Sequence, residues 1–257
     1  MMKAAVDLVA DLGEGFGCYK IADDSKILEV VGSANIACGF HAGDPRTMDN
    51  AVKLAVEHGV GVGAHPGFPD LVGFGRRDMN CTSWEITTDV LYQLGALNAF
   101  VKSYGGHLQH ITPHGRLGNL ADSDRRYAEA VLEAVVRFDE KLIIAVSEGE
   151  LWQMAKEKGL RVATLMLGDR SYNDDGSLVN RRLPNAVIKD PEKVMERCVR
   201  MVTTGKVMSI NGKEIDKKGN TLLLHGDTDG SLELARKIRA ALLAAGVEIR
   251  TMEQQLS

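Results

Sequence analysis

Short apolar runs alternate with longer amphipathic segments along most of this chain. Each run covers four to six residues, the length expected of a buried strand rather than a helix. The runs lie at residues 4–9, 33–37, 60–64, 108–112, 142–146, 161–165 and 221–224. Seven such runs separated by helical patterns predict βα units around a parallel sheet.

The segments between the runs carry helix signals. Asp44 and Pro45 have the spacing of an N-cap and a first helical position, and Thr82 and Glu85 have that of a capping box. The Asn-Gly pair at 211–212 instead indicates a hairpin, so a small excursion is expected at 208–215. Further helical stripes are predicted at 122–138, 148–158, 191–204 and 231–245.

Length and composition indicate an α/β protein with one large core. The 257 residues contain no Pro/Gly/Ser-rich linker and no internal repeat, which predicts a single domain over 1–257. Hydrophobic residues make up 44% and charged residues 26%, which excludes disordered and fibrous classes. Seven parallel strands can close into a barrel or remain an open, doubly wound sheet, and strand number does not decide between them.

Charge and cysteine content narrow the classes of partner. A net charge of -4 without a run of five like charges favours neither nucleic acid nor an anionic membrane as a partner. No signal peptide and no apolar stretch of about 20 residues is found. The four cysteines form no C-x-x-C pair and are typical of reduced thiols. We expect a cytoplasmic protein that acts on small molecules.

Polar residues with catalytic capacity follow almost every predicted strand, mostly in Gly-rich segments. In α/β barrels and open parallel sheets, substrates bind on the loops at the carboxyl ends of the strands. Four of the seven histidines lie there, which predicts one shared hydrolytic site. The candidate residues are Asp11, Glu14, Asn35, His41, His65, Arg76, Arg77, His114, Asp169, Arg170, His225 and Asp227.

Each of these features also has a structural interpretation. A lone carboxylate can cap a turn, a lone histidine is often a hydrogen-bonded structural residue, and glycines can serve tight turns. Arg76 and Arg77 form either a solvated pair or a bidentate clamp for a carboxylate or phosphate. The glycine spacing matches neither a P-loop nor a dinucleotide fingerprint. Histidines and carboxylates at strand ends are also compatible with a divalent metal, whose ligands stay unassigned because H-E-x-x-H is absent.

Several long segments resemble the LamB/YcsF family. The matching stretches are D-L-G-E-G-F-G at 11–17, S-A-N-I-A-C-G-F-H-A-G-D-P at 33–45, G-A-H-P-G-F-P-D-L-V-G-F-G-R-R-D-M at 63–79, P-H-G at 113–115, D-R-S-Y at 169–172, D-G-S-L at 175–178 and H-G-D at 225–227. They are distributed from one end of the chain to the other, and the second and third are long and unusual.

The resemblance implies a fold and a reaction. The fold is a TIM-like, irregular seven-stranded (β/α) barrel of the glycoside hydrolase/deacetylase type. The reaction is the ATP-dependent opening of the 5-oxoproline lactam to L-glutamate, performed with partner subunits B and C. A five-membered lactam is a poor electrophile, so ATP would activate it by phosphorylating the amide oxygen before water attacks. Whether the chain also forms a homo-oligomer is left open.

The resemblance and the strand-end positions together suggest roles. The histidines at 41, 65, 114 and 225 would supply acid/base groups, and Asp11, Glu14 and Asp227 would orient them or activate water. Asn35, Asp169 and the arginines at 76, 77 and 170 would contact the substrate.

Several positions depart from the family pattern, among them Arg116, Gly118 and Gly168. The chain has Val9, Thr112 and Leu165 where the family carries Asn, Lys and Glu, which would change the charge of the pocket and the choice of substrate. Two other functions therefore stay open. One is a metal-dependent, deacetylase-like hydrolase that acts alone, and the other is a non-catalytic subunit that binds a ligand.

Overall fold

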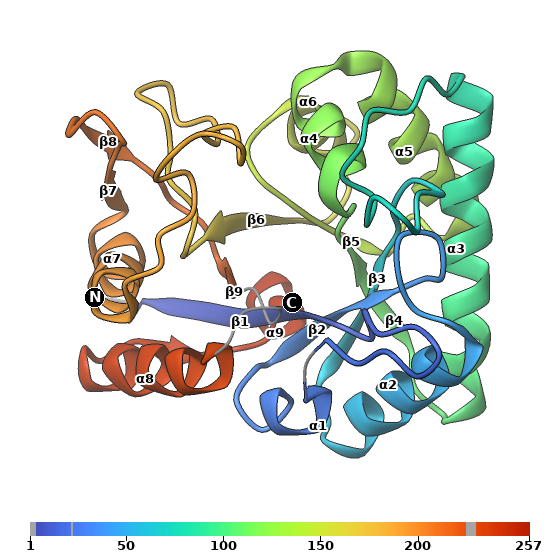
Figure 1. Cartoon of the computed structure of the whole chain (residues 1–257), viewed down its shortest axis with the longest axis horizontal. Helices are drawn as coiled ribbons and strands as arrows, with labels where there is room; N and C mark the ends of the chain where they lie inside the picture. The colour runs from blue at the N-terminus through green and yellow to red at the C-terminus, as the bar shows by residue number, and fades with distance from the viewer. Residues whose placement is uncertain (1–3, 22, 225–229) are drawn as a thin grey trace.

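A computed structural model describes residues 4–21, 23–224 and 230–257 of the chain (Figure 1). Within these residues, seven parallel strands close into a barrel because β1 pairs with β2 on one side and with β9 on the other. The barrel strands, in spatial order, are β1 (Ala5–Leu12), β2 (Ser33–Ala37), β3 (Gly61–His65), β4 (Leu108–Ile111), β5 (Ile143–Val146), β6 (Val162–Leu167) and β9 (Thr221–Leu224). The seven predicted strands and the irregular barrel are confirmed, and the open sheet is excluded.

Helices cover the outside of the barrel, with α3 packed on α5 at one side and α7 on α8 at the other (Figure 1). They are α1 (Asp24–Ile27), α2 (Pro45–Glu57), α3 (Ser83–Ser103), α4 (Gly115–Ser123), α5 (Arg125–Phe138), α6 (Glu150–Glu157), α7 (Pro191–Thr204), α8 (Ser231–Ala244) and α9 (Met252–Leu256). Asp44 caps α2 by accepting from the backbone N–H of Arg46, and Thr82 and Glu85 form the predicted capping box of α3. None of these described helices is long and apolar enough to cross a bilayer.

Two small elements lie outside the barrel strands. The hairpin of β7 (Lys206–Met208) and β8 (Glu214–Asp216) confirms the excursion predicted from Asn-Gly, and Gly212 takes the expected positive φ of 81°. Strand β10 (Glu248–Ile249) pairs in parallel with the first residues of β1. The short helices α1, α4 and α9, of four, nine and five residues, were not predicted.

Side chains alternate between the two faces of each barrel strand. In β1, Leu8 and Ala10 face the helices and belong to the main core, whereas Val9 faces the barrel interior. Val9 packs there with Ile143 and Leu165 in a second, separate apolar cluster. The side of the interior nearest β5, β6 and β9 is therefore apolar.

The opposite side of the interior is polar and almost fully buried. Asp7 accepts a hydrogen bond from the Ser33 hydroxyl at 2.6 Å, and Asn35 and His110 lie in the layer above, both 0% exposed. A register shift between β3 and β4 makes Gln109 an extra residue, because Val62 pairs with Leu108 but Gly63 pairs with His110. This bulge turns both Gln109 and His110 inward.

Gly63 makes room for His110. A Cβ atom on Gly63 would lie 2.0 Å from His110 Nε2. We expect Gly63→Ala to lower the free energy of unfolding by about 1–3 kcal/mol or more, because the imidazole must leave its site. Urea denaturation would measure the change. Gly95→Ala is the matched control, since its Cβ meets nothing within 4 Å in the middle of α3 and should stabilise the protein by up to about 1 kcal/mol. Equal stability of the two variants would contradict the steric argument.

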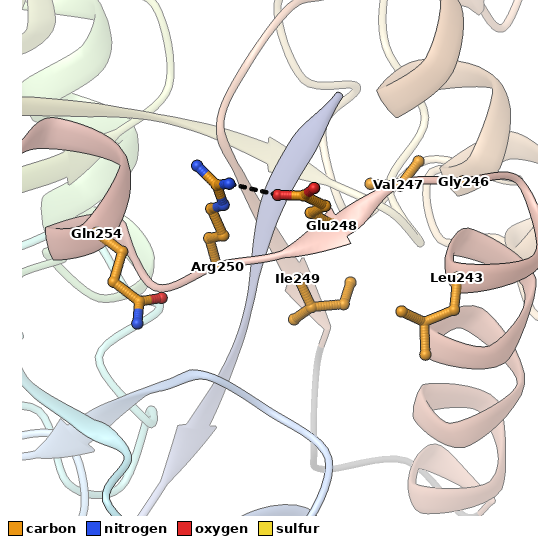
Figure 2. Close-up of a pocket in the computed structure, with 7 residues that line it drawn as sticks. All are labelled: Leu243, Gly246, Val247, Glu248, Ile249, Arg250 and Gln254. Carbon is orange, nitrogen blue, oxygen red and sulfur yellow. Dashed lines mark ion pairs between the residues drawn. The ribbon is translucent and has the colours of Figure 1, made fainter. Parts of the chain in front are cut away.

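A groove of about 730 Å³ lies at the amino-terminal end of β1, between α8, β10 and α9 (Figure 2). Leu243 and Ile249 line it, and an ion pair joins Arg250 to Glu248 on its wall. It lies at the opposite end of the barrel from the strand-end histidines. The groove therefore contributes nothing to a site built on those residues.

Candidate active site

Four strands deliver histidines and carboxylates to the carboxyl edge of the barrel. Asp11 lies near the end of β1 and Glu14 just after it, His41 follows β2, His65 ends β3 and His114 follows β4. All five are at most 9% exposed. One ligand atom from each of Glu14 and the three histidines lies within 4.8 Å of the others. These five of the sequence-predicted residues therefore form one cluster.

Backbone carbonyls set the tautomers of two of the imidazoles. His65 Nδ1 lies 2.6 Å from the carbonyl oxygen of Thr112, and His114 Nε2 lies 2.9 Å from that of Phe74. A carbonyl only accepts, so both nitrogens carry the proton. The other two nitrogens, His65 Nε2 and His114 Nδ1, then face each other at 2.9 Å with a lone pair each. This gap requires a shared proton or a cation.

Two carboxylates add negative charge around the same gap. Glu14 Oε1 lies 3.6 Å from His114 Nδ1 and 3.3 Å from His41 Nε2, and Asp11 Oδ1 lies 3.5 Å from His65 Nε2. Imidazole nitrogens and a carboxylate oxygen that converge in this way form a donor set suited to a divalent transition metal. The Glu14 and histidine cluster could therefore hold a metal ion.

Burial keeps the stacked imidazoles neutral. The rings of His41 and His114 are parallel within 4°, with centroids 3.7 Å apart. Burial lowers the pKa of both rings well below the usual value, and the neighbouring histidines and Arg76 lower it further. The Phe74 carbonyl opposes this effect at His114. Both rings are therefore proton acceptors rather than fixed cations near neutral pH.

A strained loop lies against the imidazole stack. Phe74 has a φ of 54°, which is unfavourable for a bulky side chain, and its ring lies nearly perpendicular to the rings of His41 and His114, at centroid distances of 5.6 and 5.2 Å. Gly75 follows, also with positive φ, where a Cβ would lie 2.7 Å from His41 Cβ. Asp70 holds the loop by accepting from Gly73 N. The close packing leaves the rings little freedom.

The structure separates the predicted substrate contacts into two groups. Asn35 lies below the cluster and donates to Asp11 Oδ1 at 2.8 Å. Arg76 is exposed at the border of the cluster, and its guanidinium carbon lies 4.9 Å from the centre of the Phe74 ring. Its charge reaches His41 and His114, so it lies close enough to attract an anionic ligand.

The other three predicted contacts lie in the surrounding loops. Arg77 forms an ion pair with Asp70. Arg170 is buried and donates to the carbonyl oxygens of Val179 and Ala186, and burial lowers its pKa. Asp169 is half-buried beside it at the end of β6. In this arrangement Arg77 and Arg170 hold loops on the site's border.

Some sequence features fall outside the cluster. His225 and Asp227 lie outside the described residues. Burial raises the pKa of the Cys38 thiol to about 12, which argues against a nucleophilic role for it at neutral pH. Val9 and Leu165, which stand where the family carries Asn and Glu, pack in the same inner apolar cluster. Thr112, which stands where the family carries Lys, is buried with no hydrogen-bond partner for its hydroxyl.

Sequence reasoning did not select two residues that contact the candidate active site. His110 lies within β4 rather than after it, so a search of strand ends passes over it. Phe74 matters through its carbonyl and its strained φ, which no side-chain pattern reveals. The alternation of His110, Ile111 and Thr112 could have placed His110 inside the barrel, but this alternation does not predict that Gln109 also turns inward at the bulge.

The chain is similar to known proteins over nearly its whole length. The LamB/YcsF family model matches residues 6–257. A protein of Fusobacterium nucleatum named as the A subunit of 5-oxoprolinase is 46% identical over 98% of both chains, and one of the same name from Syntrophobacter fumaroxidans is 47% identical over 97% of this chain and 99% of its own. These matches include nearly every residue of the barrel.

Solved structures agree at the level of the fold. The crystal structure of a lactam utilization protein from Thermus thermophilus has a TM-score of 0.90 and 46% identity, covering 96% of this chain and 99% of that one. A T48 deacetylase solved with its substrate has a TM-score of 0.50 at 13% identity, over 98% and 90% of the two chains, and so shares the fold alone. The expected barrel of deacetylase type is confirmed, and the chain belongs to the LamB/YcsF family.

Proposed function

We propose that this chain is the A subunit of a 5-oxoprolinase and carries the hydrolytic site that opens the 5-oxoproline lactam to L-glutamate. The observation that carries the proposal is the buried cluster at the carboxyl edge, where two unprotonated imidazole nitrogens face each other between two carboxylates. The names of relatives at 46–47% identity over nearly the whole chain support the lactam as substrate.

The cluster suits the proton transfers that ring opening needs. Water must lose a proton as it adds to the lactam carbon, and the ring nitrogen must gain one as its bond to carbon breaks. His65 Nε2 and His114 Nδ1, 2.9 Å apart, can accept that proton, share it and return it. Glu14 and Asp11 stabilise the imidazolium that exists between the two steps. Arg76 lies where it can attract the carboxylate of the substrate.

ATP and partner subunits complete the proposal. Lactam opening is unfavourable alone, and phosphorylation of the amide oxygen by ATP would make the ring carbon electrophilic. The described residues include no P-loop, so we propose that ATP binds with the help of subunits B and C. The name that the relatives share designates one subunit of an enzyme, which implies a complex of several chains. We further propose a cytoplasmic location, where ATP is available.

Reconstitution tests this function directly. The chain is incubated with its partner subunits, ATP and 5-oxoproline, and glutamate and phosphate are measured together. We expect the two products in equal amounts, and neither product when this chain is left out. Binding of 5-oxoproline without turnover in the full complex would instead identify a non-catalytic binding subunit.

A metal-dependent amide hydrolase is the second candidate function, favoured by the facing lone pairs of His65 and His114. Ligand atoms about 2.1 Å from an ion lie at most about 4.2 Å apart, so ligand atoms within 4.8 Å need only a small inward shift. Three imidazoles and one carboxylate suit Zn²⁺ or a similar ion better than Mg²⁺ or Ca²⁺, which prefer oxygen ligands. A bound ion of this kind would lower the pKa of a water molecule.

Metal content distinguishes the two candidates. If the second is correct, untagged protein purified without chelator should contain about one equivalent of a transition metal per chain by mass spectrometry. His65→Ala and Glu14→Gln should lose it, whereas His107→Ala should retain it, because His107 is exposed and contacts Glu253 far from the cluster. If the protein stays metal-free after incubation with Zn²⁺, the metal-dependent candidate is wrong, and a shared proton lies between His65 and His114.

A further inference from the structure

A line of buried hydrogen bonds runs from the barrel interior to the candidate active site. His110 Nε2 lies 2.8 Å from Asn35 Oδ1, and Asn35 Nδ2 donates to Asp11 Oδ1 at 2.8 Å. The same Asp11 oxygen lies 3.5 Å from His65 Nε2. His110 and Asn35 are both 0% exposed, so bulk water does not compete for these hydrogen bonds.

Only one arrangement of protons satisfies this line when Asp11 is ionised. The carboxylate accepts, so the amide nitrogen of Asn35 faces Asp11 and its oxygen faces His110. That oxygen also accepts, so His110 carries its proton on Nε2. Burial lowers the pKa of His110 to about 3, which keeps the ring neutral and leaves a lone pair on Nδ1.

Gln109 can satisfy that lone pair. Its terminal amide lies 3.2 Å from His110 Nδ1 and 3.2 Å from the hydroxyl of Ser33. With the amide nitrogen on this side, Gln109 donates to both, and Ser33 donates onward to Asp7 at 2.6 Å. Amide oxygen and nitrogen exchange places in a 180° turn, so this assignment follows from the network. Gln109 thereby fixes the ring of His110 from below.

One β-bulge and two glycines make room for this line of hydrogen bonds. The bulge turns Gln109 and His110 inward together, and the glycines opposite them on β3 leave the space that both side chains occupy. A Cβ on Gly61 would lie 2.5 Å from the Gln109 amide, and one on Gly63 would lie 2.0 Å from His110. A polar layer with these requirements is a built feature, because an apolar interior would need none of them.

We propose that His110 and Asn35 are positioning residues that hold the Asp11 carboxylate in the orientation that faces His65. This proposal deepens the proposed function, and its kinetic test rests on that function. His110 directs the Asn35 amide, and the amide directs one oxygen of Asp11 toward the imidazole that exchanges protons. Neither residue contacts substrate in this scheme. Their effect should therefore fall on turnover rather than on binding.

Kinetics of the reconstituted complex provide the first test. His110→Leu and Asn35→Leu remove the hydrogen bonds, and each should lower kcat about 10- to 100-fold with KM within about twofold. The double variant should be no slower than the slower single variant, because both break one line. His110→Gln should restore kcat to within about threefold of wild type, since its amide nitrogen reaches the position of Nε2.

Nitrogen-15 NMR of the histidine rings provides a test that needs no turnover. His110 should show a protonated Nε2 and an unprotonated Nδ1 between pH 5 and 8. The ring nitrogens of His65 should shift in His110→Leu and stay near their wild-type positions in His110→Gln. Thr221→Val is the control, because it removes a buried hydroxyl that has no partner in the same interior.

The outcomes separate the positioning role of His110 and Asn35 from the proposed function. Wild-type kcat in His110→Leu, failure of a folded His110→Gln to restore kcat, or additive losses in the double variant would overturn the positioning role. If the wild-type complex opens no lactam, the proposed function fails and the NMR experiment alone tests the positioning role. Unchanged His65 resonances in His110→Leu would then overturn it, and the expected shift would support it.

Discussion

His65→Ala is expected to lower kcat/KM for lactam opening about 10²- to 10⁴-fold in the reconstituted complex, the range for loss of a general acid/base. His65 contributes one of the two facing lone pairs, and its Nδ1 is held by the Thr112 carbonyl at 2.6 Å, so no other side chain can take its place. The assay measures glutamate and phosphate release at several concentrations of 5-oxoproline. Retention of glutamate formation would remove His65 from the mechanism.

A second histidine gives the matched control. His107→Ala changes an exposed ring whose partner is Glu253, and activity should stay within about twofold of wild type. Thermal unfolding of both variants shows whether loss of activity reflects loss of structure. A folded His65→Ala with full activity would contradict the assignment of the cluster as the active site. Full ATP hydrolysis without glutamate in that variant would place His65 after the phosphoryl transfer.

The second large effect concerns Asp7 at the base of the barrel interior. Its carboxyl group is fully buried, and burial raises its pKa to about 7 although the Ser33 hydroxyl and the Met252 backbone N–H both oppose the shift. An unfolded chain would have a pKa near 3.9 at this residue. The folded protein therefore holds a proton that the unfolded chain releases between about pH 4 and pH 7.

This difference makes stability depend on pH with a definite sign. A state that binds the proton more tightly is favoured at low pH, so the free energy of unfolding should fall as pH rises from about 4 to 7. The difference between a pKa of about 7 in the folded protein and about 3.9 in the unfolded chain corresponds to about 4 kcal/mol of unfolding free energy as an upper limit. Above pH 7 the ionised Asp7 remains buried with its own Oδ1 unpartnered, and the loss is complete.

Asp7→Asn removes this titration. We expect the variant to gain stability relative to wild type as pH rises from 5 to 8, measured by urea denaturation at each pH. Burial also raises the pKa of Asp122 to about 7, but that contribution is common to both proteins and cancels in their difference. Asp44→Asn is the control, because Thr47 lowers the pKa of Asp44 to about 2 and its effect is constant above pH 5. Parallel curves for wild type and Asp7→Asn would contradict a protonated Asp7.

Much of the fold follows from local patterns. The seven apolar runs match β1 to β6 and β9 within two or three residues at each end, because parallel strands that are buried on both faces appear in the sequence as short continuous apolar runs. The caps at Asp44 and Thr82 were readable because a side chain that accepts from the first helical N–H groups has a fixed spacing. Closure into a barrel was not readable from strand number. It depends on β1 pairing with β9, more than 200 residues away.

The candidate site was predicted in part. Strand-end position brought Asp11, Glu14, His41, His65 and His114 to attention, and these five lie together. The same rule selected Arg77 and Arg170, which pair with Asp70 and with backbone carbonyls. The strand-end position of a charged residue predicts that it lies at the edge of the sheet. It does not predict which partner the side chain binds there.

The sequence by itself determined the alternation of strands and helices, the family, and the group of residues that could act at the carboxyl edge, because these depend on local spacing. Only the tertiary structure decided that His65 and His114 expose facing lone pairs, since that follows from carbonyls of Thr112 and Phe74 on other segments. It also decided that His110 reaches Asp11, through a bulge and two glycines on the neighbouring strand. Proton positions depend on contacts between distant segments, and those contacts exist only after the barrel has closed.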